Sequence, residues 1–342
     1  MNRYQPGPPA SALAPPQPRV AVLLCNLGTP DEPTTAAVRR YLAEFLSDPR
    51  VVEIPAWAWQ PILHGIVLRT RPAKSAAKYA SIWTSEGSPL KVWTERQAKY
   101  LQGYLGERGK SVTVRAAMRY GSPGIARQLS DLSAQGVRHF LILSAYPQYS
   151  GTTTASLADA VFAWAARQRV VPELRFVNAY PSEPGYIAAL AQSVKEHWQR
   201  EGRRGHLLMS FHGVPARTVA LGDPYQRDCE ETARLLAARL GLESADWTLA
   251  YQSRFGKAKW LEPSTSAVLH GLAARGSKTI DVICPGFTSD CLETLEEIAQ
   301  EGRADFLGAG GQDFGYVPCL NERGDWLAAL TQIAARHLDG WV

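Results

Sequence analysis

Cysteine is scarce and scattered in this sequence. The 342 residues include five cysteines, at positions 25, 229, 284, 291 and 319, and no two of them form a C-x-x-C pair. This spacing argues against a disulfide framework and against a tetrahedral zinc site. It fits a reducing, cytoplasmic compartment best.

Long apolar runs and runs of one charge sign are missing as well. No uninterrupted apolar segment is long enough to span a bilayer. The net charge of +5 is modest and is not gathered into a run of Lys and Arg, so the sequence predicts no nucleic-acid partner. Residues 1–18 are rich in Pro and Ala and lack an apolar core segment, so we expect a disordered leader and not a signal peptide.

Several familiar catalytic motifs are absent too. No G-x-G-x-x-G follows the first apolar run, and G-x-x-x-x-G-K-[ST], H-E-x-x-H and G-x-S-x-G do not occur. Nucleotide cofactors, zinc proteolysis and serine hydrolysis therefore lose their usual support.

Apolar runs alternate with helical periodicity along most of the chain. Runs typical of strands lie near residues 20–26, 112–118, 138–144, 174–179, 207–212, 247–252, 280–284 and 314–318. Stretches typical of amphipathic helices lie between most of them, at 122–136, 152–169, 184–201, 224–241, 264–276 and 290–302. This alternation predicts an α/β fold whose parallel sheets are flanked by helices, with four strands in each half.

Short echoes between the halves predict an internal duplication. Leu27-Gly28-Thr29-Pro30 follows the first strand much as His212-Gly213-Val214-Pro215 follows the fifth. We expect two similar lobes with the active site in the cleft between them. Their predicted ranges are 19–183 and 184–323, followed by a C-terminal segment, 324–342, whose helix packs back on the first lobe.

Two strand ends carry polar groups. His212 ends the apolar run Leu207-Leu208-Met209-Ser210-Phe211, and an acidic segment follows the run that ends at Cys284. The carboxyl edge of a parallel sheet is where open α/β folds bind ligands. An imidazole there can bind a metal or accept a proton near neutral pH. A lone histidine is more often a core residue whose hydrogen bonds are satisfied. The surrounding sequence has to distinguish such a core histidine from a functional one.

Three carboxylates begin the acidic segment. Asp290, Glu293 and Glu297 are spaced i, i+3 and i+7, which would place them on one face of a helix. Carboxylates this close favour proton relay and attract hard cations. The alternative is structural, because Asp290-x-x-Glu293 also has the spacing of a capping box.

An apolar segment, residues 54–71, is unusual. Its apolar part, Ile54 to Leu68, is rich in Trp, Ile and Leu and is interrupted by Pro55, Pro61 and His64, and the segment ends with Arg69 and Arg71. Such a segment either dips into a membrane interface or lines the mouth of an apolar pocket. A core helix is the alternative.

Five segments together resemble motifs of the ferrochelatase family, in the expected order. They are Gly87-Ser88-Pro89-Leu90 with Trp93-Thr94, Met118-Arg119-Tyr120, Ser210-Phe211-His212-Gly213-Val214-Pro215, Tyr251-Gln252-Ser253-Arg254 with Trp260, and Pro285-Gly286-Phe287-Thr288-Ser289-Asp290-Cys291-Leu292-Glu293-Thr294-Leu295-Glu296-Glu297. The resemblance covers roughly residues 20–320. It implies a class II chelatase-like fold of two Rossmann-like lobes without a nucleotide. It also implies a lyase that inserts Fe²⁺ into protoporphyrin IX in haem biosynthesis.

The resemblance assigns roles to individual residues. His212 and Glu293 become catalytic residues on opposite sides of the porphyrin ring: His212 is a metal ligand or a proton acceptor, and Glu293 is a metal ligand or a proton conduit. Glu297 and Asp290 form a secondary acidic path. The residues implied to contact the porphyrin are Leu27, Ser88, Arg119, Tyr120 and Trp260. Residues 54–71 match a hydrophobic lip that admits the porphyrin and offers peripheral contact with the inner face of the membrane. Fe²⁺ is a substrate, and no tightly bound cofactor is expected.

Departures from the family pattern narrow the prediction. Cys291 stands where many relatives have histidine, so a mechanism that needs this second histidine is in doubt here. Only Cys319 lies where some relatives gather cysteines around an iron–sulfur cluster, so we expect no cluster. Leu27 stands where relatives that use coproporphyrin tend to have tyrosine, which favours protoporphyrin. Coproporphyrin III or cobalt as substrates, and a non-catalytic porphyrin or haem carrier, stay open as alternatives.

Overall fold

The computed structural model describes Tyr4 and residues 19–202, 205–256 and 258–342. The predicted leader, 1–18, lies outside the described residues apart from Tyr4. The chain divides into two compact units. Unit 1 contains the described residues as far as Ala145, together with Gly151–Ala179 and Leu330–Val342, and unit 2 contains Tyr146–Ser150 and Tyr180–Ala329.

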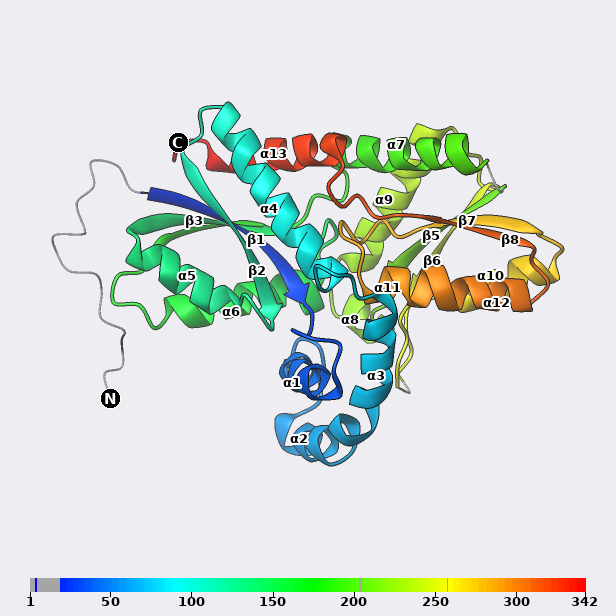
Figure 1. Ribbon diagram of the computed structural model, residues 1–342, viewed down its shortest axis with the longest axis horizontal. Helices are drawn as coiled ribbons and strands as arrows, with labels where there is room; N and C mark the ends of the chain where they lie inside the picture. The colour runs from blue at the N-terminus through cyan, green and yellow to red at the C-terminus, as the bar shows by residue number, and fades with distance from the viewer. Residues whose placement is uncertain (1–3, 5–18, 203–204, 257) are drawn as a thin grey trace. The chain divides into compact units, whose positions relative to one another are not determined.

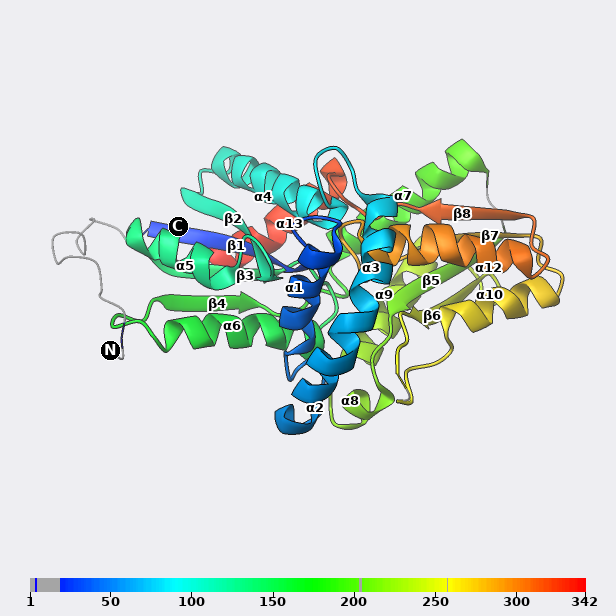
Figure 2. The same ribbon diagram turned by 60° about the horizontal axis from the view of Figure 1, so that its bottom comes forward.

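Unit 1 is built on a parallel sheet of four strands. The strands are β1 (Arg19–Gly28), β2 (Val112–Tyr120), β3 (Val137–Ser144) and β4 (Glu173–Val177), in the order β2-β1-β3-β4. Helix α4 (Pro89–Glu107) covers one face, and α5 (Ile125–Ala134) and α6 (Ser156–Ala165) cover the other (Figures 1 and 2). Between β1 and β2 the chain also forms α1 (Thr35–Leu46), α2 (Ala56–Ile62), η2 (Leu63–Val67) and α3 (Leu68–Ile82).

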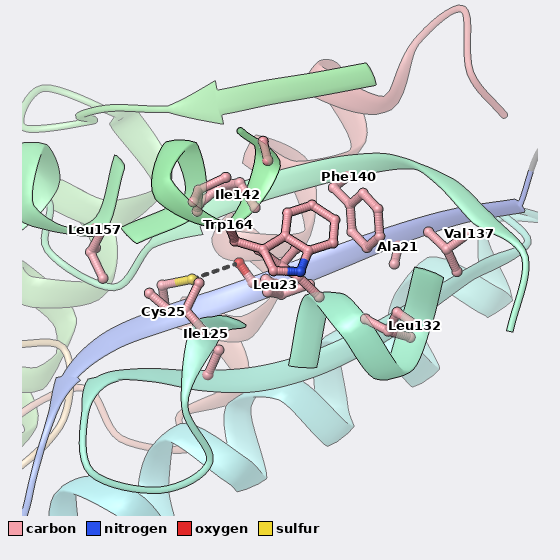
Figure 3. Close-up of a cluster of buried hydrophobic side chains, with 14 residues drawn as sticks. Ala21, Leu23, Cys25, Ile125, Leu132, Val137, Phe140, Ile142, Leu157 and Trp164 are labelled. Atoms are coloured by element: carbon pink, nitrogen blue, oxygen red, sulfur yellow. Dashed lines mark hydrogen bonds between the residues drawn. The ribbon is translucent and has the colours of Figure 1, made fainter. Parts of the chain in front are cut away.

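The core of unit 1 follows from the alternation of side chains along β1. Ala21, Leu23 and Cys25 point to one face of the sheet, where they pack against side chains of α5, β3 and α6, including Phe140 and Trp164 (Figure 3). The intervening residues of β1 are equally buried on the other face. A strand that is apolar on both faces requires helices on both, which is why a run such as Val20–Cys25 predicts a central parallel strand.

Unit 2 repeats this plan. Its strands are β5 (His206–His212), β6 (Trp247–Gln252), β7 (Thr279–Ile283) and β8 (Asp313–Val317), all parallel, in the order β6-β5-β7-β8. On one face lie α10 (Thr265–Ala274) and α12 (Arg303–Gly308), and on the other lie α7 (Pro184–Glu201) and α9 (Tyr225–Leu240) (Figure 1). The short α8 (Ala216–Ala220) follows β5, and α13 (Gly324–Leu338) follows β8.

The predicted duplication is visible in the topology. Both sheets have the same strand order, with the first strand of each set paired to the second and the third. The second strand ends alike in both units: the backbone N–H of Met118 donates to the carbonyl of Pro123 over 2.7 Å, and that of Tyr251 donates to Pro263 over 2.9 Å. Leu27 and His212 therefore occupy matching positions at the carboxyl ends of matching strands.

The eight predicted strands and the two-sheet fold class are confirmed, and two predicted helices are corrected. The stretch at 152–169 begins as a π-helix, η3 (Gly151–Ala155), before α6. The acidic stretch at 290–302 is not one helix, because a single turn, α11 (Leu292–Leu295), is followed by a π-helix, η4 (Glu297–Gly302). Periodicity cannot separate these helix types, since both are amphipathic over one or two turns.

The predicted limits of the lobes and the divisions of the structure lie close together along the chain. The structure divides at Ala179 and within α13, at Leu330, and it assigns Tyr146–Ser150 to unit 2. Among the described residues, no helix is both long enough and apolar enough to cross a membrane.

Candidate functional site

His212 is the last residue of β5, at the carboxyl edge of the unit 2 sheet. Its ring is half-buried, and its centroid lies 6.4 Å from that of Phe287. The preceding residues of β5, Leu207–Phe211, are buried, so His212 is the partly exposed polar side chain at the carboxyl end of a buried strand. The strand register pairs His212 with Gln252 of β6.

The hydrogen bond of His212 fixes which ring nitrogen is free. Nδ1 lies 2.6 Å from the carbonyl oxygen of Gly213. Because a carbonyl can only accept, Nδ1 carries the proton and donates it, so the neutral ring presents Nε2 with its lone pair. The same contact restrains the ring orientation. Nε2 of His212 is therefore the ring nitrogen available to a proton or a metal ion.

Gly213 allows the chain to turn tightly after this histidine. Its N–H donates to the carbonyl oxygen of Gln252 over 2.7 Å. A Cβ at this position would lie 2.7 Å from that oxygen and 3.2 Å from the indole of Trp260, so any side chain would force the backbone apart.

Trp260 lies beside this turn. It is 5% exposed, its indole N–H donates to the carbonyl of Phe255 over 3.0 Å, and the two rings are 4.9 Å apart. Most of the ring is used in packing within unit 2. The predicted stacking of Trp260 on a porphyrin stays a prediction.

Glu293 and Glu297 lie where α11 gives way to η4, and both are half-buried. Gln252 ties this segment to the sheet, since its Nε2 donates to the carbonyl of Glu293 over 2.7 Å while its Oε1 accepts from Ser210 over 2.6 Å. The end of β6 therefore sets the position of the segment that carries Glu293.

Ser253, the next residue, binds both oxygens of the Glu297 carboxylate. Its backbone N–H donates to Oε1 over 2.6 Å, and its hydroxyl donates to Oε2 over 2.5 Å. Burial raises the pKa of Glu297; the Ser253 hydrogen bonds and the charge of His212 oppose that rise, and the charge of Glu293 adds to it. Glu297 therefore holds a proton more readily than an exposed glutamate, and it responds to the charges of His212 and Glu293.

Asp290 does not begin the helix as the capping alternative expected. The N-cap is Cys291, whose N–H donates to the Thr294 hydroxyl over 2.9 Å in a reciprocal capping box. Asp290 is 5% exposed and accepts hydrogen bonds from the side chains of Tyr316 at 2.5 Å, Asn321 at 2.7 Å and Thr294 at 3.1 Å. These contacts favour an anchoring role, and a place for Asp290 in an acidic path stays a prediction.

Leu27 and Ser88 lie in unit 1. Leu27 is half-buried next to the end of β1. Ser88 is the N-cap residue of α4 and is 3% exposed, and its hydroxyl is 2.8 Å from that of Thr29. That hydroxyl already has one partner, so binding a propionate would use its remaining donor or acceptor capacity.

Arg119 and Tyr120, at the end of β2, share a buried carboxylate that no sequence pattern predicted. Asp48 Oδ2 accepts from Arg119 Nη2 at 2.6 Å, from the Tyr120 hydroxyl at 2.8 Å and from Ser156 Oγ at 2.6 Å. Burial alone would raise the pKa of Asp48, but the Ser156, Arg50 and Tyr120 hydrogen bonds and the Arg119 charge outweigh it and lower that pKa. Asp48 is 71 residues from Arg119 along the chain.

These contacts limit what Arg119 and Tyr120 can offer a ligand. Nε of Arg119 donates to the carbonyl and hydroxyl of Ser156, so its Nη1 side is the part left for a carboxylate. The Tyr120 side chain is 0% exposed, with the Arg119 guanidinium 4.6 Å from the ring centroid. In this arrangement Tyr120 supports Arg119, and its predicted contact with a porphyrin stays a prediction.

Comparison with known proteins identifies the family. The family model named Ferrochelatase matches residues 19–338. The ferrochelatase of Methylibium petroleiphilum is 66% identical over 94% of this chain and 89% of that protein. The ferrochelatase of Polaromonas sp. is 63% identical over 98% of this chain and 90% of that protein. The chain belongs to the ferrochelatase family.

A solved structure agrees on the fold. SirB from Bacillus subtilis with Fe³⁺ superposes with a TM-score of 0.54 at 13% identity, covering 74% of this chain and 92% of that one. At this identity the likeness concerns the fold alone. The predicted recognition, the fold class and the assignment as an enzyme, a metal-chelating lyase that inserts iron into a porphyrin for haem synthesis, are confirmed.

The metal-binding role of His212 and Glu293 stays a prediction. Among the described residues, no group of three or more His, Cys, Asp and Glu side chains is arranged to hold a metal ion. The five cysteines are free and buried. A cavity of about 290 Å³ in unit 2 is lined by α7 and the segment after β8, and none of the predicted site residues lines it.

The lip segment divides into a buried and an exposed face. Leu63 and Leu68 are buried with Leu46 in one apolar cluster, and Trp59 packs against it. Other apolar side chains of the segment face outward: Trp57 is 82% exposed and Ile66 is 59% exposed. The buried face belongs to an apolar core, as the core-helix alternative expected, and contact of the exposed face with a membrane or a pocket mouth stays a prediction.

The structure adds functional residues that sequence reasoning did not single out. Ser253 lies inside a matched motif, but only the structure shows that it binds both oxygens of the Glu297 carboxylate. Asp48 stood in no quoted motif, and nothing in its neighbourhood pointed to Arg119.

Proposed function

We propose that this ferrochelatase inserts Fe²⁺ into protoporphyrin IX and releases two protons, with His212 and Glu293 as its catalytic residues. The observation that carries the proposal is that unit 2 holds a histidine that presents Nε2 together with Glu293 and Glu297, and that the charge of this histidine lowers the pKa of Glu297.

The chemistry needs a proton acceptor and a weak metal site. The macrocycle loses two pyrrole N–H protons, and its four nitrogens take up the ion, so charge and atoms balance without a redox partner. Nε2 of neutral His212 is a suitable acceptor for a pyrrole proton or a ligand for incoming Fe²⁺. The carboxylate of Glu293 can take the other role, and Glu297, whose pKa burial raises, can receive a proton and pass it on.

The choice of protoporphyrin rests on Leu27. Its side chain is half-buried and apolar at the carboxyl end of β1, in the position that matches His212 of unit 2. An apolar side chain there suits a porphyrin edge that carries vinyl or methyl groups better than one that carries propionates. Arg119, held by Asp48, is suited to a carboxylate of the substrate.

We also propose peripheral membrane contact through residues 54–71, on the cytoplasmic face. Trp57, Ile62 and Ile66 are exposed on one face of the segment at 82%, 43% and 59%, and the exposed Arg69 and Arg71 follow them. Exposed Trp and Ile beside arginine suit an interface with anionic lipid. This contact would bring a greasy substrate to the enzyme from the bilayer.

The test is anaerobic insertion of Fe²⁺ or Co²⁺ into either protoporphyrin IX or coproporphyrin III, measured by the change in porphyrin absorbance. Wild type should favour protoporphyrin IX, and His212→Ala should bind it with unchanged affinity while losing turnover by about a thousandfold. Faster turnover of coproporphyrin III would overturn the choice of substrate, and faster turnover with Co²⁺ would overturn the choice of metal. Tight binding without turnover by either metal would leave a porphyrin carrier.

A further inference from the structure

Ser253 has a backbone conformation that few non-glycine residues adopt. Its φ is +64°, and Asn321 is the other non-glycine residue with positive φ among those the structure describes. In this left-handed region the Cβ of an L-residue crowds the following carbonyl, so a serine persists there only when its surroundings hold it. Strained residues gather at functional sites, and the contacts of Ser253 indicate what holds it.

The left-handed turn directs two donors of one residue to one carboxylate. Both the N–H and the hydroxyl of Ser253 bind Glu297, one to each oxygen, at 2.6 and 2.5 Å. A carboxylate held at both oxygens has its plane and distance fixed, unlike one held by a single flexible partner. Ser253 directly follows Gln252, which pairs with His212 in the sheet and binds the Glu293 carbonyl.

One short segment, Gln252–Ser253, therefore connects all three predicted proton and metal groups. Gln252 sets the backbone at Glu293, Ser253 sets the carboxylate of Glu297, and strand register sets both relative to His212. The charge of His212 lowers the pKa of Glu297 and the charge of Glu293 raises it, so a displacement of the Glu297 carboxylate would change both effects.

We propose that Ser253 is a positioning residue for the chelatase reaction, and that its hydroxyl holds the Glu297 carboxylate at the place where it receives a proton released from the porphyrin. The inference rests on the proposed function, because it takes Glu297 as a proton acceptor. Ser253 itself does not bind substrate or transfer the proton. Its effect is exerted on turnover and not on substrate affinity.

Three substitutions separate the hydroxyl from the backbone conformation. Ser253→Ala keeps the N–H donor and the strained backbone but removes the hydroxyl. Ser253→Gly also removes the hydroxyl, while glycine adopts the positive φ without strain. Ser266→Ala is the matched control. Ser266 is an exposed serine on α10, and its hydroxyl also donates to a carboxylate of unit 2, that of Asp305 on α12, over 3.1 Å.

The measurement is steady-state insertion of Fe²⁺ into protoporphyrin IX under anaerobic conditions. We expect kcat to fall about tenfold in both Ser253→Ala and Ser253→Gly, the effect of losing one hydrogen bond to a charged group. KM for porphyrin and for Fe²⁺ should stay within about twofold, and Ser266→Ala should match wild type. If Ser253→Gly is as active as wild type while Ser253→Ala is slow, backbone strain and not the hydroxyl matters, and the proposal is overturned.

A double-mutant cycle with Glu297→Gln distinguishes this inference from the function on which it rests. If the serine acts through Glu297, adding Ser253→Ala to Glu297→Gln should slow the enzyme no further than about twofold. Effects that multiply would show that the serine acts independently and would refute the positioning role. A Glu297→Gln enzyme with wild-type turnover would instead remove Glu297 from the proposed function, and slow Glu297→Gln beside unchanged Ser253→Ala would remove only Ser253.

Discussion

Exchanging Asp290 and Asn321 tests whether Asp290 anchors the acidic segment. The two residues form two hydrogen bonds with each other: Asn321 Nδ2 donates to Asp290 Oδ2 over 2.7 Å, and the backbone N–H of Asp290 donates to Asn321 Oδ1 over 2.9 Å. In Asp290→Asn, the new amide group at position 290 would face the amide group of Asn321, donor against donor.

The expected loss follows from these contacts. The single substitution removes one hydrogen bond to a charged group and leaves two buried donors facing each other. The free energy of unfolding should therefore fall by about 2–4 kcal/mol. The reciprocal substitution Asn321→Asp restores an acceptor opposite the new amide and keeps the acceptor for the position 290 backbone. The double exchange should recover at least about half of the loss.

The assay combines thermal unfolding with hydrogen exchange of the amides in Cys291–Glu296. The single variant should lower Tm by about 5–10 °C if unit 2 unfolds on its own, and should speed exchange in this segment before the rest of the unit. The exchange data are needed because a chain of two units need not unfold in one step. The anchoring role would be refuted if Asp290→Asn were as stable as wild type. It would also be refuted if the double variant, Asp290→Asn with Asn321→Asp, recovered none of the lost stability.

Turnover decides between anchoring and proton relay. If Asp290 only anchors Glu293 through the Cys291–Thr294 turn, the exchange should restore kcat together with stability. Recovery of stability without recovery of kcat would mean that the carboxylate at position 290 itself takes part in proton transfer, as the acidic-path interpretation requires.

Three further predictions follow from single contacts. Burial raises the pKa of Glu297 above its ordinary 4.5, so the stability that protonated Glu297 contributes is present below the unfolded pKa and is lost as the pH rises through the folded pKa. Glu297→Gln should therefore raise Tm at about pH 8 and leave Tm unchanged at about pH 4. An equal gain in Tm at both pH values would contradict a raised pKa of Glu297. Gly213→Ala should destabilise the protein by about 1–3 kcal/mol in urea unfolding, because its Cβ would meet the Gln252 carbonyl, whereas Gly103→Ala on α4 meets no heavy atom within 4 Å and should stabilise by about 0.5–1 kcal/mol. Trp57 is exposed, so Trp57→Ala should weaken sedimentation with anionic vesicles without changing Tm. Trp59 packs against the apolar cluster, so Trp59→Ala should lower the free energy of unfolding by about 3 kcal/mol. Unchanged vesicle binding by both variants would contradict membrane contact through residues 54–71.

The sheet structure was available from the sequence because its signal is local. Val20–Cys25 and Leu207–Phe211 are almost entirely apolar and are buried on both faces, as a central parallel strand flanked by helices requires. The acidic segment was predicted less well. Its spacing predicted one helix with three carboxylates on one face. In the structure Asp290 accepts hydrogen bonds from Tyr316 and Asn321, and the N-cap is Cys291, which forms a capping box with Thr294.

The sequence by itself determined the two-sheet fold, the position of His212 at a strand end, the position of Glu293 in the acidic segment after β7, and the family, because periodicity and short motifs are properties of neighbouring residues. Only the tertiary structure decided how the site is held. Ser253 meets Glu297 across 44 residues, and Asp48 meets Arg119 across 71. The His212 tautomer depends on the direction of a neighbouring carbonyl. Such contacts arise from how strands align and where loops turn back, and no local pattern of residues encodes the partner that a side chain finds once the sheet has formed.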